Sequence, residues 1–309
     1  MEKKILIAVD QSIHSRKAIE YCIEMHSIIK NMSFVLINIQ PKISDFLFHE
    51  SESDQSTKEG LKEMADKNQK HSMKILGHAK NTMIKMGVSE KLIETASFPA
   101  IKGISKEILD YAKQIICDAI VVGNRGTTKL TEAFTHSITN NILEFTDTVP
   151  IWAVDGNVRA QNVMVAVDGS ESSLAAVDHT AFMFSGNTST DIMLLHVTPS
   201  LRDFCTIDFK KRSSKMEDII SKGDKQCIDS FYVRAQKIFT EAGLKKNQVH
   251  TIEVKNRISI GKTIVTQAKK HDCGTLVMGR RGTNNSFFIG SVSRYVITNA
   301  KGCAVWLVP

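Results

Sequence analysis

The chain has 309 residues and a formal net charge of +7, and 42% of its residues are hydrophobic and 24% charged. This composition is ordinary for a globular protein, and the length predicts two domains. No apolar run approaches the roughly 20 residues that span a bilayer, which argues against a membrane protein.

The chain opens with a short apolar strand. Residues 5–9 are followed by Asp10, and this run is too short for the core of a signal peptide. We therefore expect a cytoplasmic protein. The six cysteines lie far apart, without a Cys-x-x-Cys pair or the His and Cys spacing of a zinc site. This pattern favours reduced, structural thiols and no metal site.

The sequence repeats itself once, and three segments of its first part recur later in the same order. They are KILIAVDQS at 4–12 and NVMVAVDGS at 162–170, AIVVGNRGTT at 119–128 and TLVMGRRGTN at 275–284, and VPIWAVD at 149–155 and CAVWLVP at 303–309. Such a long repeat indicates a duplicated domain and not a solenoid, whose repeats are about 20–50 residues long. We predict one domain over 1–156 (the first half) and another over 160–309 (the second half).

Strands and helices alternate in each half. In the first half, the pattern predicts a polar loop around 49–57 and a long helix near 58–86. The second half carries apolar strands at 163–168, 191–197, 248–254, 274–282 and 304–309, and helices after Ser170 or Ser172 and at 215–242, 260–273 and 290–300. Apolar strands without polar alternation indicate a parallel sheet covered on both faces. The predicted fold is therefore α/β, with two tandem doubly wound domains.

The loop after the fourth strand of the second half is a candidate ligand site. In open parallel sheets, ligands bind beyond the carboxyl ends of the strands, where the strand order reverses. Asp168 ends the first strand and Gly279 the fourth, so both line one crevice if these strands are neighbours. Gly279 and Gly282 allow close approach to the backbone, and Gly290 leads into a helix whose first amides suit a phosphate. The same glycines also fit an ordinary turn between a strand and a helix, and the residues alone leave both interpretations open.

Two familiar phosphate-binding motifs are missing from the sequence. Neither G-x-x-x-x-G-K-[ST] nor a G-x-G-x-x-G after the first strand occurs. Without the first motif, no lysine is placed to drive transfer of a γ-phosphate. The sequence also shows no pair of general acid and base and no nucleophile with its base, so we expect no catalytic residues.

Taken together, the segments resemble the universal stress protein domain. VMVAVDGSESS, LVMGRRG and IGSVSRYVITNAKGCAVWLVP stand in the order and at the distances of that family, and the resemblance covers both halves. It implies a five-stranded parallel sheet in the order 3-2-1-4-5 in each half, with helices on both faces. Some members of the family bind ATP through G-x2-G-x9-G-[ST], whereas members without this motif do not.

The resemblance assigns a nucleotide site to the second half. Asp168 matches the family's adenosine-binding aspartate, and Val197 matches the residue that contacts adenine. The matching positions are Ala166, Asp168, Val197, Met278, Gly279, Gly282, Gly290, Ser291, Val292 and Ser293. Seven residues separate Gly282 from Gly290, two fewer than in the family motif. Because both ends of the loop are kept, we expect ATP to bind here, with or without Mg²⁺.

The first half departs from the family motif in another way. Its matching positions are Asp10, Gly123, Gly126, Ser137 and Thr139. The spacing of the motif is kept, but His136 stands where the motif has its third glycine. A Cβ and an imidazole there would crowd a phosphate that approaches the backbone, although this histidine also fits as a polar residue flanking the next helix. We therefore expect weaker nucleotide binding in the first half, or none.

The charges and the terminal strands bear on the partners of the protein. Residues 1–157 hold 19 Lys and Arg against 20 Asp and Glu, whereas residues 158–309 hold 21 against 13. The basic second half suits an anionic ligand, or is simply a solvated basic surface. Arginines and aromatics do not interleave as in a nucleic-acid platform, so no nucleic-acid partner is expected. The resemblance further implies that the strands holding Trp152 and Trp306 pair within the chain as a pseudo-dimer, to which a further homodimer could be added.

Three functions stay open from the sequence. The leading hypothesis is a cytoplasmic stress-response or signalling protein that binds ATP mainly in its second half and acts by binding. The second is an interaction scaffold of the same fold, in which both sites are empty. The third is a slow nucleotide hydrolase that uses Asp168 with Mg²⁺.

Overall fold

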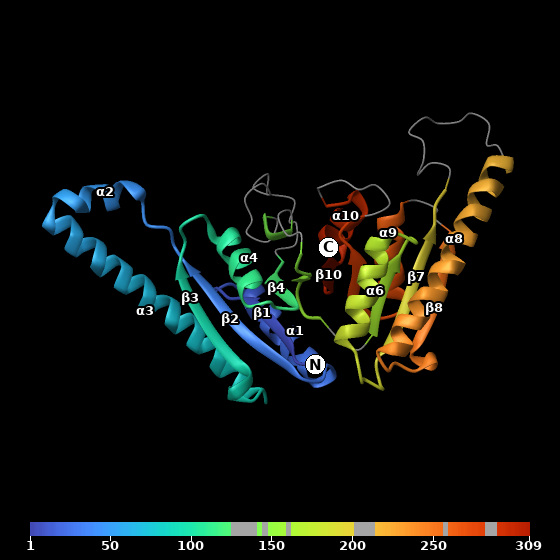
Figure 1. Cartoon of the computed structure of the whole chain (residues 1–309), viewed down its shortest axis with the longest axis horizontal. Helices are drawn as coiled ribbons and strands as arrows, with labels where there is room; N and C mark the ends of the chain where they lie inside the picture. The colour runs from blue at the N-terminus through green and yellow to red at the C-terminus, as the bar shows by residue number, and fades with distance from the viewer. Residues whose placement is uncertain (125–140, 144–147, 159–161, 201–213, 256–258, 282–288) are drawn as a thin grey trace.

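The structure is a computed structural model of the whole chain (Figure 1). It describes residues 1–124, 141–143, 148–158, 162–200, 214–255, 259–281 and 289–309. Within these ranges, no helix combines the length and the hydropathy that are needed to cross a bilayer.

The first half contains the predicted alternation of strands and helices. Its elements are β1 (Lys3–Ala8), α1 (Ile13–Ile28), β2 (Met32–Gln40), α2 (Asp45–Ser53), α3 (Gln55–Lys85), a 3-10 turn (Glu90–Leu92), β3 (Ile93–Pro99), α4 (Ile104–Gln114), β4 (Ala119–Gly123) and β5 (Ile151–Val154). Residues 141–143 are also helical.

The second half repeats this order. Its elements are β6 (Asn162–Val167), α6 (Glu171–Met183), β7 (Asp191–Thr198), α8 (Ser214–Glu241), a 3-10 turn (Lys246–Gln248), β8 (Val249–Lys255), α9 (Ile260–Lys270), β9 (Cys273–Gly279), α10 (Ser291–Asn299) and β10 (Ala304–Val308). Ser170, one of the two predicted caps, begins α6 by accepting a hydrogen bond from the Ser173 amide at 3.1 Å.

The strands of both halves form one continuous sheet with the order β3-β2-β1-β4-β5-β10-β9-β6-β7-β8. All neighbouring strands within a half are parallel and follow the predicted order 3-2-1-4-5. The halves meet at β5 and β10, which pair antiparallel with Trp152 opposite Trp306. The terminal strands thus pair inside the chain, as the sequence predicts.

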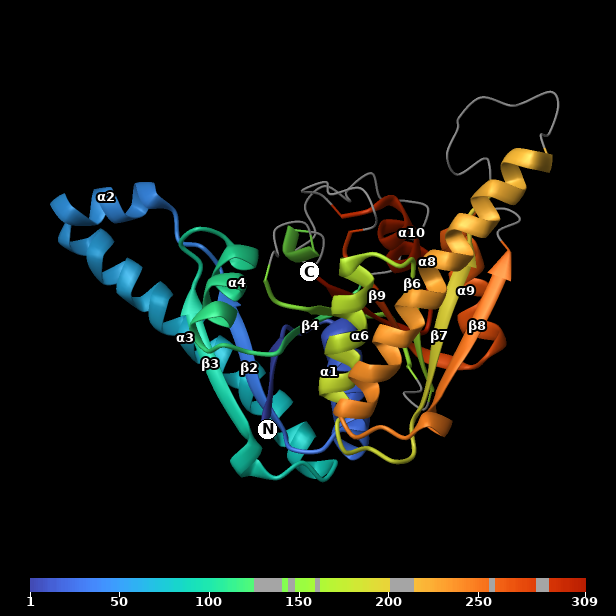
Figure 2. The same cartoon turned by 45° about the vertical axis from the view of Figure 1, so that its right-hand side comes forward.

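Helices cover both faces of the sheet (Figures 1 and 2). One buried hydrophobic cluster joins the sheet to α1, α3, α6 and α8, and it contains both tryptophans. A second cluster joins the opposite face to α4, α9 and α10. The inner strands are therefore covered on both faces, which explains why they lack polar alternation, whereas the edge strands β3 and β8 are partly exposed.

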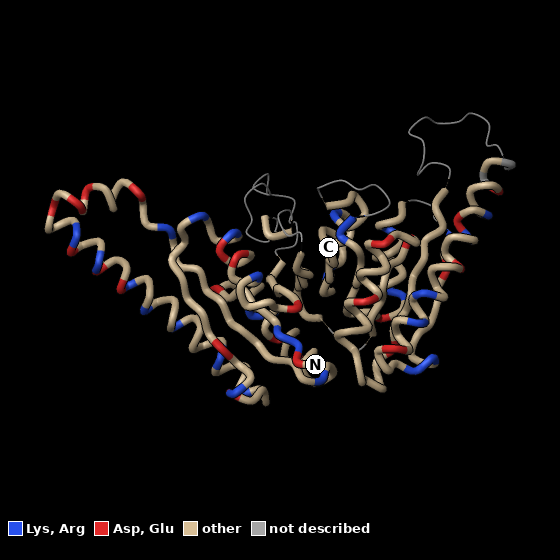
Figure 3. Tube along the Cα trace, viewed as in Figure 1, with Lys and Arg blue, Asp and Glu red and all other residues tan. Residues whose placement is uncertain are grey.

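The polar loop predicted around 49–57 is wrong, because most of this stretch is helical. α2 ends at Ser53, and Asp54 then caps α3 by accepting a hydrogen bond from the Thr57 amide at 2.7 Å. α2 has no buried residue and packs against the start of α3, well away from the sheet (Figure 1). Acidic and basic residues alternate along this projecting arm (Figure 3), which is why its sequence has the character of a loop.

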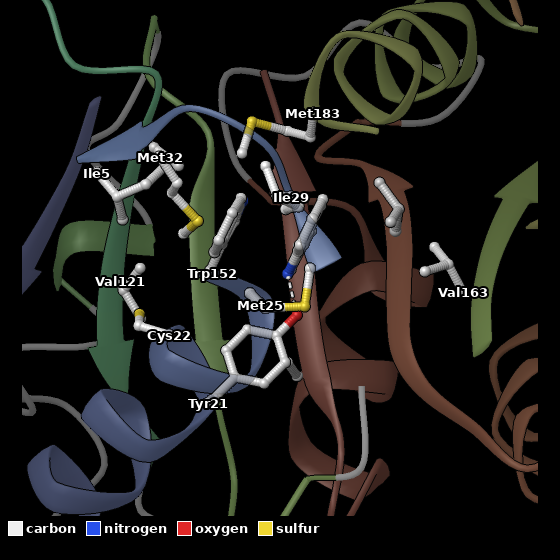
Figure 4. Packing of buried hydrophobic residues seen from close by; sticks show 14 of the residues in the cluster. Ile5, Tyr21, Cys22, Met25, Ile29, Met32, Val121, Trp152, Val163 and Met183 are labelled. Carbon is white, nitrogen blue, oxygen red and sulfur yellow. Dashed lines mark hydrogen bonds between the residues drawn. The ribbon is translucent and has the colours of Figure 1, made fainter. Parts of the chain in front are cut away.

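The two halves contribute matching side chains to the antiparallel junction of β5 and β10. The indoles of Trp152 and Trp306 stack with their centroids 3.9 Å apart and an interplanar angle of 1°. Trp306 Nε1 donates to the Tyr21 hydroxyl at 2.9 Å, and Trp152 Nε1 donates to Nε2 of His179 at 3.2 Å. Figure 4 shows Tyr21 and Trp152, with the hydrogen bond to the Tyr21 hydroxyl dashed. Each half therefore supplies the acceptor for the tryptophan of the other half, as in an isologous dimer interface.

Candidate functional site

The carboxyl ends of β6 and β9 lie side by side, as the candidate site requires. The two strands pair in parallel, and Ala166 is the register partner of Met278. The chain leaves β6 towards β7 on one side of it, while β9 lies on the other side. This is the reversal of strand order beyond which ligands bind in open α/β sheets.

Asp168 follows β6 directly and lies exposed at this edge. Its Oδ1 atom accepts a hydrogen bond from the Ser170 amide at 3.1 Å, and Gly169 between them has φ +81°. Only glycine adopts this left-handed conformation without strain, so the turn is well defined. The side chain is exposed and its other carboxylate oxygen has no hydrogen bond among the described residues, so this oxygen can accept from a ligand.

Three apolar side chains of the predicted site are buried at the same edge. Ala166, Val197 and Met278 are 8%, 6% and 5% exposed, and all belong to the hydrophobic cluster on the side of α9 and α10. We call these three residues the apolar floor. A floor of this kind suits the face of an aromatic base.

Gly279 is required by helix packing. A Cβ at this position would come within 2.8 Å of the carbonyl carbon of Ser172, in the first turn of α6, and closer still to the Ser172 hydroxyl. Gly123 meets the same obstacle in the first half, where a Cβ would lie 2.8 Å from the Cβ of His14. Neither glycine has a positive φ. The expectation that Gly279 serves ligand approach is thus joined by a packing role that needs no ligand.

The start of α10 is attached to the end of β9. The amide of Gly290, the N-cap residue, donates to the Arg280 carbonyl at 3.0 Å, and the Ser293 hydroxyl donates to the Gly279 carbonyl at 3.0 Å. No side chain of the described residues caps this helix. The first-turn amides of Ser291 to Ser293, including Val292, therefore face outward with partial positive charge, and such helix ends bind anions.

The two arginines of the loop differ sharply. Arg280 is 1% exposed, and its Nε donates at 3.1 Å to the carbonyl of Leu143, which belongs to the first half. Arg280 is therefore buried at the contact between the halves and does not face solvent. Arg281 is half-buried, and its Nε is buried without a hydrogen-bond partner among the described residues. A buried donor of this kind is costly unless something binds it.

The first half presents the matching geometry. Asp10 is exposed, and its Oδ1 accepts from the Ser12 amide at 2.9 Å. Asn124, which follows Gly123, donates through Nδ2 to the carbonyl of Ile297 on α10 at 3.1 Å. This bond is the counterpart of the bond from Arg280 to the first half. Five residues considered from the sequence lie outside the described residues: Gly126, His136, Ser137 and Thr139 in the first half and Gly282 in the second.

The sequence reasoning missed His196, which lies beside Val197 on β7. Its side chain is 3% exposed, with Nδ1 3.0 Å from the Val167 carbonyl and Nε2 2.9 Å from Oδ2 of Asp224 on α8. The signal was one ionisable residue inside the apolar run IMLLHV, at 192–197. Such a residue marks a place where a polar group must be held inside the fold.

Possible metal ligands and thiols were the remaining reactive groups considered from the sequence. No three His, Cys, Asp or Glu side chains cluster at metal-binding spacing in the described part of the chain. Burial raises the pKa of the Cys117 and Cys273 thiols to about 12, so they stay protonated and unreactive at neutral pH. This protonation agrees with the structural role predicted for the cysteines.

Comparison with known proteins gives one family over both halves. The model of the universal stress protein family matches residues 1–154 and 159–309. Comparison with curated proteins gives no significant match.

Two solved structures that match nearly the whole chain share its fold. A universal stress protein from Archaeoglobus fulgidus DSM 4304 has a TM-score of 0.65 and 17% identity, over 99% of this chain and 97% of that chain. A functionally unknown protein from Pseudomonas aeruginosa PAO1 has a TM-score of 0.59 and 14% identity, over 99% of this chain and 92% of that chain. A single-domain universal stress protein solved in complex with cAMP matches 48% of this chain at a TM-score of 0.35 and 22% identity, over 97% of that chain.

Proposed function

Because the chain belongs to the universal stress protein family, we propose that it is a stress-response or signalling protein that binds ATP mainly in its second half. The protein acts in the cytoplasm by binding, and any hydrolysis at the site is slow. One observation carries the proposal. The exposed carboxylate of Asp168, the apolar floor and the N-terminus of α10 meet where β6 and β9 end side by side.

Each of these groups suits one part of an adenine nucleotide. The apolar floor suits the adenine ring, and the free oxygen of Asp168 accepts from the ribose hydroxyls. The first-turn amides of α10 suit the phosphates. The Nε of Arg281, which has no hydrogen-bond partner among the described residues, would find an acceptor in a phosphate oxygen, and this supports an anionic ligand beside the loop. Mg²⁺ would bind together with the phosphates.

One observation favours the scaffold as the rival function. Gly279 and Gly123 are both explained by packing against the helix that follows the first strand, and the Ser293 hydroxyl is already bonded to a backbone carbonyl. A loop with these features would be kept in a protein that binds no ligand. The two functions therefore have to be separated by a binding measurement.

The deciding experiment is direct detection of the nucleotide. Purified protein is denatured and the released ligand identified by mass spectrometry, and ATP, ADP and AMP are titrated by calorimetry into nucleotide-free protein. We expect one tight site per chain, lost in Gly290→Val. Gly290 has φ −63°, which any residue adopts, so this variant should keep the fold. The absence of released nucleotide, heat and any melting shift would refute the proposal, and two equal sites per chain would refute the preference for the second half.

Hydrolysis is tested separately. Phosphate release from ATP with Mg²⁺ should be slow in the wild type. A fast release that disappears in Asp168→Ala would favour the hydrolase over a binding protein. The native mass of the same preparation shows whether two chains form the further homodimer.

A further inference from the structure

Helix α8 contacts the turn that carries Asp168. Asp224 of α8 makes a buried contact with His196. The His196 ring in turn contacts the carbonyl of Val167, the residue immediately before Asp168. One turn further along α8, Cys227 lies against the same turn, because a Cβ at Gly169 would come within 2.9 Å of its sulfur. Figure 2 shows α8 running beside α6.

A third contact lies at the surface. Arg234 of α8 donates from both terminal nitrogens to the two carboxylate oxygens of Glu171, at 2.8 and 3.1 Å. Glu171 is the first residue of α6. Their side chains are 51% and 78% exposed, so this ion pair adds little to stability. The buried contact of His196 is therefore the one that can determine where the turn lies.

The protons on His196 follow from its partners. A backbone carbonyl can only accept, so Nδ1 must donate to Val167. The second ring nitrogen, Nε2, lies 2.9 Å from Oδ2 of Asp224. Neighbouring charges are Lys225 and Asp229 on α8 and Glu253, which is the register partner of His196 on β8.

The first half builds the same link from neutral groups. Asn38 on β2 donates from Nδ2 to the Val9 carbonyl at 2.6 Å, and Val9 immediately precedes Asp10. The amide oxygen of Asn38 accepts from the Ser72 hydroxyl of α3 at 2.6 Å. In both halves, therefore, the long helix holds a side chain of the second strand, and that side chain holds the carbonyl before the aspartate. This recurrence with different residues indicates a function beyond filling space.

We propose that His196 and Asp224 are positioning residues for the nucleotide site of the second half. They fix the Val167 carbonyl relative to α8 and thereby the place of the Asp168 carboxylate. The proposal rests on the proposed function as far as ATP is concerned, but its effect on the turn exists without ligand. The amide of Ser170, which donates to Asp168 Oδ1, reports that effect by its hydrogen exchange.

The test compares His196→Ala with His196→Asn/Asp224→Ser, which copies the pair Asn38 and Ser72. We expect His196→Ala to weaken ATP binding about tenfold, the size expected for loss of one buried hydrogen bond to a charged group. We also expect faster exchange of the Ser170 amide. The double variant should restore both values to within about threefold of the wild type. Asn38→Ala is the matched control and should leave ATP binding in the second half unchanged.

The outcomes separate the two proposals. A folded His196→Ala protein with wild-type affinity and wild-type exchange of Ser170 overturns the positioning role. If the wild type binds no ATP, the proposed function fails, and the exchange of Ser170 alone decides whether His196 positions the turn. If His196→Ala does not fold, Asp224→Ala takes its place, and wild-type affinity and exchange in that variant overturn the proposal.

Discussion

Acid should loosen the junction between the halves through His179. This ring is buried, and its Nε2 accepts a hydrogen bond from Trp152, so it must be unprotonated there. Burial lowers the pKa of His179 from 6.5 to about 3. The unfolded chain takes up this proton below pH 6.5, whereas the folded chain does not. The contribution of His179 to stability is therefore complete above pH 6.5 and is lost as the pH falls from 6.5 towards 3.

The size of the effect follows from the gap between the two pKa values. pH 5 lies about 1.5 units below the pKa of His179 in the unfolded chain. Protonation of His179 therefore stabilises the unfolded state by about 2 kcal/mol at this pH. His179→Gln should remove this term, because a glutamine oxygen still accepts from Trp152 but does not titrate. His26, whose pKa is also lowered by burial, acts in the same direction, so the difference between wild type and variant isolates His179.

The assay is urea unfolding followed by tryptophan fluorescence at pH 7 and pH 5. We expect the wild type to lose about 2 kcal/mol more than His179→Gln over this interval. His49→Gln changes an exposed histidine on α2 and should follow the wild type. If wild type and His179→Gln lose the same stability between pH 7 and pH 5, the ring is not held neutral at the junction and the reasoning is refuted.

Three further predictions concern the candidate site. Asp168→Asn should weaken ATP binding at least tenfold while Asp10→Asn does not, and calorimetry that shows equal losses would contradict a site in the second half. Gly279→Ala should destabilise the protein by about 1–3 kcal/mol because its Cβ meets α6; Gly77→Ala in the open middle of α3 should stabilise it by about 0.5–1 kcal/mol, and a neutral Gly279→Ala in urea melts would remove the packing explanation. Arg280→Met should cost about 1–3 kcal/mol, since it removes a buried hydrogen bond to a carbonyl of the first half; an unchanged urea midpoint would show that this bond does not hold the halves together.

Much of the fold could be predicted from local patterns in the sequence. The helices predicted near 58–86 and over 215–242 are found as Gln55–Lys85 and Ser214–Glu241. Apolar runs and helical periodicity depend on neighbours a few residues apart, so they survive without knowledge of the fold. These patterns do not reveal α2, because this helix buries no side chain and has no apolar stripe.

Part of the candidate site could likewise be predicted from the sequence, and part could not. The positions of Asp168 and Gly279 at one edge of the sheet follow from the repeat and the strand order, and the structure agrees. The direction of Arg280 could not be predicted, because its acceptor lies 137 residues away on the other half. The partner of His196 lies on a helix whose approach to β7 depends on the packing of the whole half.

By itself, the sequence determined that this protein has two copies of one α/β domain and which ends of its strands meet. Those features repeat along the chain and depend on short-range order. The family resemblance also implied that the two terminal strands pair. Only the tertiary structure decided the side-chain contacts at that junction: the stacked pair of Trp152 and Trp306, with Tyr21 accepting for one indole and His179 for the other. Tyr21 and Trp306 are 285 residues apart. No local pattern records such a contact, because it exists only once both halves have folded and the two terminal strands have paired.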